Sequence, residues 1–389
     1  MKFLLVTWYD NNNYGTSLQV YSLKKILENP NLVYPKNRNL SKNEVFLLKH
    51  IPNRRFNLKL KIKHATSIKF YQDKIKKIKD KDKMTNTDNI KIRKRKFNEF
   101  NDKNFIFANT NPAQSKKELI DIGKKFDVYI SGSDQIWNPD SLDYTYLLYW
   151  VDKNKYKFSY GSSLSKSKIE KTDYKVYNKY LKSFNDISIR DSACRKQLSE
   201  IVEKKVTTVL DPVLLIGADG FSIKNNIKEK YIFTYFLGNN ENHRKKAIEL
   251  AKNSKNNLKS LINIDGANAS SDKILERYAL WDIDPIDFVN MISNSSFVLT
   301  DSFHATVLSI LFHKDFYVFQ KDANRPSQNS RIKELLELTK LSDRWMEDTS
   351  KATLSKIDEE KWRIADKRLN QARKESIDYL VSNIEKSRG

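Results

Sequence analysis

The sequence predicts an α/β protein of two lobes, each a parallel β-sheet flanked by helices. Short apolar runs alternate with amphipathic helical stretches, which is typical of doubly wound sheets. This alternation occurs twice, once from the N-terminus and again from Lys230. The length of 389 residues also suits two domains of about 100–200 residues each.

The first lobe is expected to begin with a strand over residues 2–8, a polar loop and a helix from Leu18 to about Leu27. Later apolar runs that end in polar turns predict further strands; these runs cover residues 126–139, 156–163 and 186–191. A last strand should stop at Asp211-Pro212, because proline cannot pair in a ladder.

The second lobe is expected to contain strands at residues 230–238, 258–264 and 297–300. The final segment, 351–389, has Trp362, Leu369 and Leu380 at helical spacing and predicts one long helix. We therefore expect Rossmann-like lobes at 1–215 and 216–350, with the last helix packing back on the first lobe. By analogy, this is the arrangement of glycosyltransferase-B-like proteins.

The positive charge is concentrated in one segment of the predicted N-terminal lobe. The net charge is +23, and residues 36–96 hold 21 Lys and Arg against 5 Asp and Glu. Ile68, Tyr71, Ile75 and Ile78 lie at helical spacing among lysines, which predicts a basic helical insertion. It could be an exposed helix without a partner, or it could bind nucleic acid or, through residues 59–83, an anionic membrane. No RNA-binding signature accompanies it, so no nucleic acid is expected.

Several classes of protein are disfavoured by what the sequence lacks. The single cysteine, Cys194, excludes a disulfide framework, and no Cys and His spacing suits zinc, so we expect no metal. There is no GxGxxG or GxxxxGK[ST] loop, and we therefore expect no nucleotide cofactor. No apolar run approaches the roughly 18 residues of a membrane span. We expect a cytoplasmic protein that contacts the inner face of the plasma membrane at most peripherally.

Polar loops at the carboxyl ends of the predicted strands form the candidate site, because ligands of doubly wound sheets bind there. Ordinary turn chemistry is the alternative explanation for any one of these loops. Near the C-terminal end of this series, Ser302 is expected to cap a helix that places His304 in its first turn. The unpaired N–H groups and the dipole of that turn favour an anion.

Several motifs are similar, in order, to those of the polysaccharide pyruvyl transferase family. The most specific are GSDQIW (132–137) and TDSFHA (300–305), and the similarity runs from residue 1 to about residue 345. The resemblance implies phosphoenolpyruvate as donor and a cell-envelope or capsular glycan as acceptor. No cofactor is implied beyond phosphoenolpyruvate as co-substrate.

The resemblance also assigns roles to individual side chains. His304 and Asp301 would be catalytic, since histidine exchanges protons near neutral pH. The predicted donor-binding residues are Arg190, Arg331, Ser302, Ser162 and Ser163. The predicted acceptor-binding residues are Asn13, Tyr14, Gln19, Asp134, Gln135 and Trp137.

Family members often carry an arginine two residues before the histidine, where this chain has Ser302. Arg190 and Arg331 would then supply the positive charge that a phosphate and a carboxylate require. The sequence leaves two other functions open. One is a glycosyltransferase that uses a nucleotide sugar, and the other is a non-catalytic module that binds glycan or nucleic acid.

Overall fold

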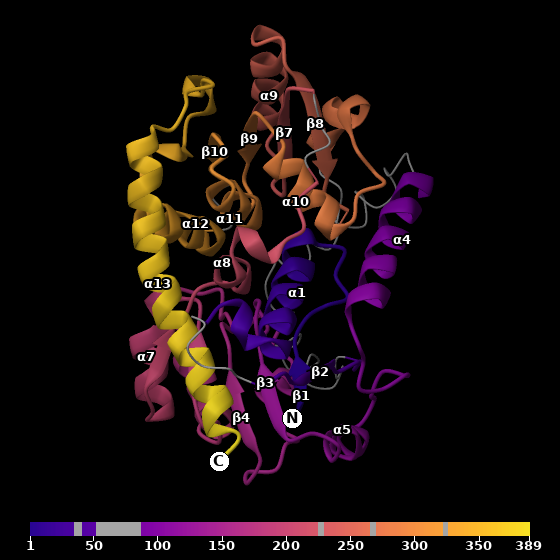
Figure 1. Cartoon of the computed structure of the whole chain (residues 1–389), viewed down its shortest axis with the longest axis vertical. Coiled ribbons are helices and arrows are strands. Elements are labelled where there is room, and N and C mark those ends of the chain that lie inside the picture. The colour runs from indigo at the N-terminus through magenta and orange to yellow at the C-terminus, as the bar shows by residue number, and fades with distance from the viewer. Residues whose placement is uncertain (35–40, 52–86, 225–228, 265–269, 322–325) are drawn as a thin grey trace.

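The computed structural model describes residues 1–34, 41–51, 87–224, 229–264, 270–321 and 326–389, which form two lobes stacked end to end (Figure 1). The N-terminal sheet has the order β2 (Glu44–Leu47), β1 (Lys2–Val6), β3 (Val128–Ser131) and β4 (Tyr156–Ser159). β5 (Ile187–Ile189) and β6 (Val206–Thr208) extend it beyond β4 through a bridge between Phe158 and Asp186. All these pairs are parallel, so the strands share one carboxyl edge.

The C-terminal sheet has the order β11 (Trp345–Met346), β10 (Phe316–Phe319), β9 (Phe297–Thr300), β7 (Tyr231–Phe236) and β8 (Asn257–Ile262). Its pairs are also parallel. Every residue of β7, β9 and β10 is buried, as expected for strands covered on both faces by helices. The predicted fold of two α/β lobes is therefore confirmed.

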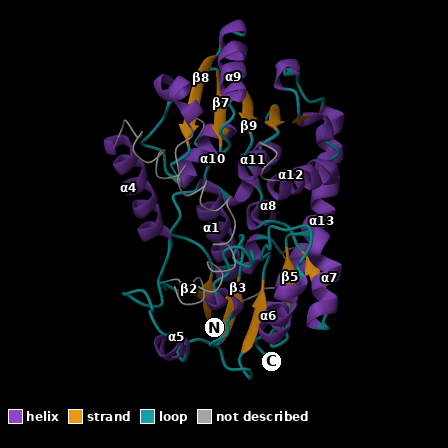
Figure 2. Cartoon of the chain, turned by 180° about the vertical axis from the view of Figure 1, so that it is seen from behind, coloured by secondary structure: helices purple, strands orange, loops and turns teal. Residues whose placement is uncertain are grey.

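Helices surround both sheets (Figure 2). In the N-terminal lobe they are α1 (Tyr14–Glu28), α4 (Thr87–Asn104), α5 (Lys116–Gly123), α6 (Lys171–Leu181), α7 (Ser192–Val202) and α8 (Pro212–Ile216). In the C-terminal lobe they are α9 (Glu241–Asn253), α10 (Pro285–Ser293), α11 (Phe303–Leu311) and α12 (Pro326–Thr339). Short 3-10 helices cover 30–32, 144–147, 218–220, 270–278, 342–344 and 349–351. None of the helices in the described residues is long and apolar enough to cross a membrane.

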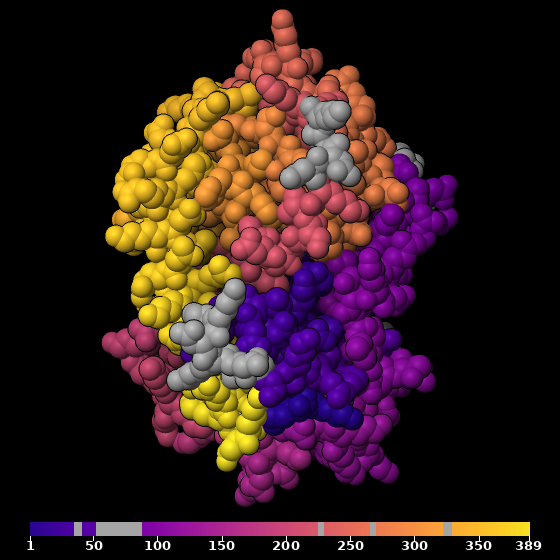
Figure 3. All heavy atoms as spheres, in the orientation of Figure 1, coloured from indigo at the N-terminus to yellow at the C-terminus, as the bar shows by residue number. Residues whose placement is uncertain are grey.

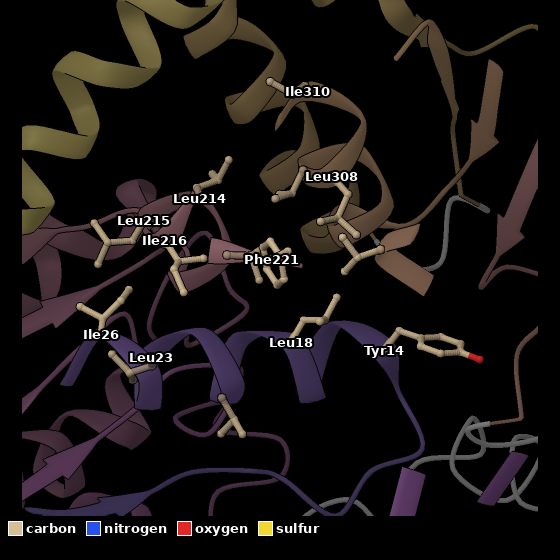
Figure 4. Close-up of a cluster of buried hydrophobic side chains, with 14 of the residues drawn as sticks. Tyr14, Leu18, Leu23, Ile26, Leu214, Leu215, Ile216, Phe221, Leu308 and Ile310 are labelled. Atoms are coloured by element: carbon tan, nitrogen blue, oxygen red, sulfur yellow. The ribbon is translucent and has the colours of Figure 1, made fainter. Parts of the chain in front are cut away.

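Helix α1 lies between the lobes (Figure 1). It starts four residues earlier than the sequence pattern indicated, because the Asn13 side chain accepts the N–H groups of Gly15 (2.9 Å) and Thr16 (3.3 Å). Figure 4 shows Leu18 and Leu23 of α1 among apolar side chains of α8 and α11. The same hydrophobic cluster contains Leu5 of β1 and Val298 of β9. The two lobes therefore share one core.

The last helix, α13 (Glu359–Lys386), runs along one flank from the C-terminal lobe to the N-terminal lobe (Figures 1 and 3). Arg373 donates to the carbonyl oxygens of Leu215 (2.7 Å) and Ile216 (2.9 Å). Farther along, the Tyr379 hydroxyl donates to the Ser159 carbonyl (2.9 Å). These bonds hold α13 against the N-terminal lobe.

The segment 36–96 is not wholly a helical insertion. Residues 44–47 form the edge strand β2, in which Val45 and Leu47 are buried, and this four-residue run is too short for a periodic signal. Residues 87–96 belong to α4, which buries Ile90 and Phe97. The predicted amphipathic helix within 59–83 lies outside the described residues.

Arg93 of α4 fastens the N-terminal lobe to the C-terminal lobe. Its side chain is buried, and its guanidinium donates to the carbonyl oxygens of Trp281 (2.9 Å), Ile262 (3.5 Å) and Leu280. The Tyr14 hydroxyl donates to the next part of the same loop, at the Ile283 carbonyl (3.0 Å). The loop that precedes α10 is therefore held by two elements of the other lobe.

Replacing Arg93 should destabilise the protein, because three buried carbonyl oxygens would lose a charged donor. We expect Arg93→Ala to lower the free energy of unfolding by about 3 kcal/mol, measured by urea denaturation. Arg95→Ala on the exposed face of α4 is the matched control, since its pair with Glu99 is solvent-exposed. Equal stability of the two variants would contradict the assigned role of Arg93.

Candidate active site

A cleft of about 230 Å³ opens between the lobes at the carboxyl ends of their strands. Six of the predicted site residues line it: Asn13, Asp134, Gln135, Ser302, His304 and Arg331. The first three belong to the N-terminal lobe and the other three to the C-terminal lobe. Residues far apart in sequence are thus brought together as the fold class predicts.

The N-termini of α1 and α11 meet at this cleft. His304 lies in the first turn of α11 and packs on the backbone of Gly15 in the first turn of α1. A Cβ atom on Gly15 would lie 2.0 Å from His304 Nδ1, so any larger residue would collide with the imidazole. Ser302 caps α11, as predicted, by accepting the Ala305 N–H (3.5 Å). Two helix dipoles therefore favour negative charge at one place.

A buried charge network joins His304 to the N-terminal lobe. His304 Nε2 lies 3.3 Å from Asp211 Oδ2, and Arg190 forms an ion pair with the same carboxylate. Arg190 Nη2 also lies 3.6 Å from Asp134 Oδ1. Burial alone would raise the pKa of Asp211, but His304 and Arg190 outweigh it and hold that pKa below the usual range. Asp211 is therefore ionised at neutral pH.

Arg331 of α12 faces Arg190 across the Phe303 ring. The two guanidinium carbons lie 5.6 Å and 5.8 Å from the ring centroid, respectively. Burial and then the charge of Arg190 lower the pKa of Arg331, and Asp191, Asp134 and Asp211 only partly compensate. Three carboxylates oppose the two guanidinium groups, yet nitrogens of both arginines lack hydrogen-bond partners among the described residues.

Several nitrogen atoms at the cleft are buried without a hydrogen-bond partner among the described residues. They are Nε of Arg331, Nε2 of His304 and, beyond the wall of the cleft, Nε and Nη2 of Arg190. His304 Nε2 and Arg190 Nη2 still lie within ion-pair distance of Asp211 and Asp134, respectively. Buried polar groups without partners are costly and rare in folded proteins. Their gathering beside two helix N-termini is the arrangement that a phosphate or carboxylate ligand would complete.

Asp134 organises the N-terminal side of the cleft. Its Oδ2 accepts the Thr16 hydroxyl (2.7 Å) and its Oδ1 accepts the Gln135 N–H (2.8 Å). Its φ of 72° turns the backbone sharply after the Gly132-Ser133 cis peptide. Asp134 therefore fixes α1 and Gln135, and only part of its carboxylate faces the cleft.

Two aromatic residues predicted to stack on a sugar do not line the cleft. Trp137 is fully buried, and its Nε1 donates to Ser131 Oγ (3.1 Å) and to the Tyr146 carbonyl (3.1 Å). Tyr14 is 1% exposed and stacks on Phe288 with ring centroids 4.6 Å apart. Both side chains belong to cores and offer no surface to a ligand.

Five more predicted residues also lie outside the lining of the cleft, and one of them, Arg190, lines the neighbouring cavity instead. Asp301 is fully buried and accepts the N–H groups of Leu237 (2.6 Å) and Gly238 (2.8 Å), so it fixes the loop after β7. Ser162 Oγ donates to the Ser131 carbonyl (3.1 Å), and Ser163 Oγ donates to Asp191 Oδ1 (3.0 Å). Gln19 is fully buried in α1. These side chains act on the loops around the cleft and not within it.

The sequence analysis did not select three residues of the site. Asp211 was interpreted as a strand end, although an Asp directly before Pro212 is also the pattern of a helix cap followed by a first-turn proline. Thr16 and Lys321 line the cleft as well, and Lys321 is buried. Neither carries a local signal, because each reaches the cleft only through tertiary packing.

Fold and site together define a two-lobed α/β protein with a polar cleft between its lobes. The chain matches the polysaccharide pyruvyl transferase family over residues 13–320. It therefore belongs to that family and is a transferase of polysaccharide biosynthesis. None of the curated proteins matches the chain in sequence.

Solved structures with similar folds are nucleotide-sugar enzymes of low sequence identity. A putative UDP-N-acetylglucosamine 2-epimerase from Listeria monocytogenes is 11% identical, covers 93% of each chain and has a TM-score of 0.47. The UDP-GlcNAc 2-epimerase from Neisseria meningitidis, solved with UDP-GlcNAc, is 11% identical over 98% of this chain and 100% of that chain, with a TM-score of 0.47.

Removing the charge of Asp211 should weaken the protein and change its response to acid. Folding lowers the pKa of Asp211 from its usual value near 3.8, so its carboxylate stabilises the protein above about pH 4 and less as the pH falls further. Asp211→Asn should lower the free energy of unfolding at pH 7 by about 3–5 kcal/mol, since one partner of a buried ion network is lost.

Urea denaturation from pH 7 down to pH 3 measures both effects. In the variant, the loss of stability below about pH 4 should be shallower than in the parent protein. Asp102→Asn, on the exposed face of α4, is the control and should leave the acid profile unchanged. An Asp211→Asn profile parallel to that of the parent would show that Asp211 does not carry this dependence.

Proposed function

We propose that the protein transfers a pyruvyl group from phosphoenolpyruvate to two hydroxyl groups of a cell-envelope or capsular glycan. The observation that carries this proposal is the set of buried guanidinium nitrogens of Arg190 and Arg331 that lack hydrogen-bond partners among the described residues, next to His304 and two helix N-termini. Phosphoenolpyruvate has a phosphate and a carboxylate on a three-carbon body, which suits a small polar cleft that is lined by Arg331 and has Arg190 beyond its wall. Membership of the pyruvyl transferase family supports the same donor.

The residues of this chain can be assigned separate tasks in that reaction. Arg331 and the first turns of α1 and α11 would neutralise the donor anion, and the ion pairs of Arg190 would keep its guanidinium in place. Ser302 takes the position at which family members often have an arginine, and Arg190 and Arg331 would supply that charge. Gln135 and Asn13, at the opposite wall, would orient acceptor hydroxyls.

Ketal formation requires protonation of the methylene carbon of the donor and the formation of two C–O bonds at the neighbouring carbon, one by addition and one by displacement of phosphate. His304 would deliver a proton to the methylene carbon, and one glycan hydroxyl would add to the cation-like carbon that results. The second hydroxyl would then displace phosphate, which leaves as the C–O bond to phosphate breaks. The hydroxyls release two protons in total, of which one replaces that given by His304 and the other leaves with phosphate.

We place this reaction in the cytoplasm, at the inner face of the plasma membrane, where a lipid-linked oligosaccharide would be the acceptor. Exposed cations of α4, namely Lys91, Lys94 and Arg95, support a peripheral contact with anionic head groups. The lysine-rich residues 59–83, which carry the same expectation, lie outside the described residues.

Phosphate release from phosphoenolpyruvate in the presence of p-nitrophenyl glycosides and lipid-linked sugars tests the proposal. We expect glycan-dependent release, a loss of at least 100-fold in kcat/KM for His304→Ala and a similar loss for Arg331→Ala. Arg331→Lys should recover little activity, because lysine lacks the planar fork of arginine. Arg195→Ala, at an exposed arginine of α7, should be as active as the parent.

Other results would select the remaining hypotheses. Thermal stabilisation by a UDP-sugar, without phosphate release from phosphoenolpyruvate, would favour a glycosyltransferase. Salt-sensitive binding to random-sequence nucleic acid, without turnover of either donor, would favour a binding module.

Adding a single methyl group to the first turn of α1 should lower the catalytic activity. Gly15→Ala places a Cβ atom against His304 and should displace the imidazole, so we expect a loss of about 100-fold in kcat, the scale of a 1 Å misplacement. Lys25→Ala in the last turn of α1 is the control. If Gly15→Ala kept parental activity and parental His304 ring resonances by NMR, the close packing of His304 on Gly15 would be disproved.

A further inference from the structure

A second and larger cavity begins at the wall of the cleft. It has a volume of about 590 Å³ and lies between the loop after β6, helix α12 and helix α13, which run side by side in Figures 1 and 2. Phe303 and Arg331 line both the cleft and this cavity. We call it the rear groove and define it by Thr208, Leu210, Phe303, Arg331, Leu338 and Ala372.

The inner end of the rear groove has unused hydrogen-bonding capacity. Arg190 lines it with a side chain that is 5% exposed, and two of its nitrogens have no partner among the described residues. Arg331 Nε and Thr208 Oγ1 are also buried there without a partner. These atoms could bind the oxygen atoms of a ligand that extends from the cleft into the groove.

The remaining walls combine apolar side chains with charged side chains of both signs. Leu210, Leu335 and Leu338 provide apolar surface, while the charged groups include Glu334, Glu375, Lys340 and Arg368. A sugar ring has an apolar C–H face and hydroxyls that donate to carboxylates and accept from guanidinium groups. A hydrocarbon chain would cover these charged groups with apolar surface, and a bare anion would have no use for the leucines. Carbohydrate is the ligand that uses both kinds of wall.

The size and course of the rear groove indicate a ligand longer than one sugar. Its volume of about 590 Å³ is within the roughly 300–1,000 Å³ of sites for drug-sized ligands, whereas the cleft is smaller. A further depression on the outer face of α13 shares Leu338, Arg368, Ala372 and Glu375 with the groove. A path therefore leads from Phe303 to the outer surface of α13, the flank seen in yellow in Figure 3.

We infer that the rear groove is the acceptor site, and that it binds an uncharged glycan segment of at least two sugars with its terminal unit at Phe303. The inference rests on the proposed function for which end of the glycan lies nearest to the cleft. It makes an oligosaccharide, and not a free monosaccharide, the preferred acceptor. Its terminal sugar would reach past Phe303 into the cleft, where Asn13 and Gln135 would orient its hydroxyls and Arg331 would hold the donor.

Direct binding tests the groove without requiring turnover. Saturation-transfer NMR would be recorded with glucose, galactose, N-acetylglucosamine, cellobiose, lactose and N,N′-diacetylchitobiose. At least one disaccharide should bind, at least tenfold more tightly than its monosaccharides. Ala372→Trp, which fills the middle of the path, should weaken that binding at least tenfold, and Lys374→Trp, on the same helix but outside the groove, should not. Melting temperatures of both variants verify folding.

The outcomes separate this inference from the proposed function. Disaccharide binding that Ala372→Trp abolishes, without phosphate release from phosphoenolpyruvate, would support the groove and reject the donor. Phosphate release with equal KM values for the disaccharide in the parent and Ala372→Trp would support the donor and overturn the groove. Failure of all six sugars to bind would also overturn it.

Discussion

The burial of α1 between the lobes is the constraint on which the site depends. Twelve of its fifteen residues are buried, because the helix contacts the N-terminal sheet on one side and α8, α10 and α11 on others. A helix enclosed in this way cannot shift without disturbing both cores. Its first turn therefore has a fixed position, and Gly15 is the residue that lets the first turn of α11 approach it. The convergence of two helix N-termini is a consequence of packing and requires no ligand to form.

Charge then couples the two lobes at the same place. Asp211 caps α8 in the N-terminal lobe through the Val213 N–H (2.9 Å), so its backbone and carboxylate are both fixed. That carboxylate lies between Arg190 of its own lobe and His304 of the other. Arg331 approaches from α12, and Asp191, Asp134 and Asp211 oppose the charges of the two arginines. Because the members of this buried network hold one another in place, the site would need little reorganisation to stabilise a bound anion.

The sequence was sufficient for the parts of the structure that repeat a local pattern. The alternating runs predicted both lobes, and the Ser302 cap with His304 in the following turn agreed with the structure. The sequence was insufficient for predicting the role of a residue where that role depends on whether the side chain is buried. Trp137 and Tyr14 have aromatic side chains of the kind that stack on sugars, but only the fold shows that both side chains are buried. Asp211 illustrates the reverse case, because nothing near it in sequence reveals that His304, 93 positions later, lies beside it. Whether the predicted catalytic and binding roles are correct depends on the chemistry and not on the fold.

The bonds of Arg93 have a consequence for how substrates arrive and products leave. Arg93 and Tyr14 tie the lobes together on one side of the molecule, and α13 ties them together on the other. Separating the lobes would break these buried bonds together with the shared core, which is too costly to repeat in each catalytic cycle. Substrates and products must therefore diffuse through openings that already exist. Turnover in such a protein would be limited by the width of these passages and the residence time of the glycan, and not by the frequency of a domain motion.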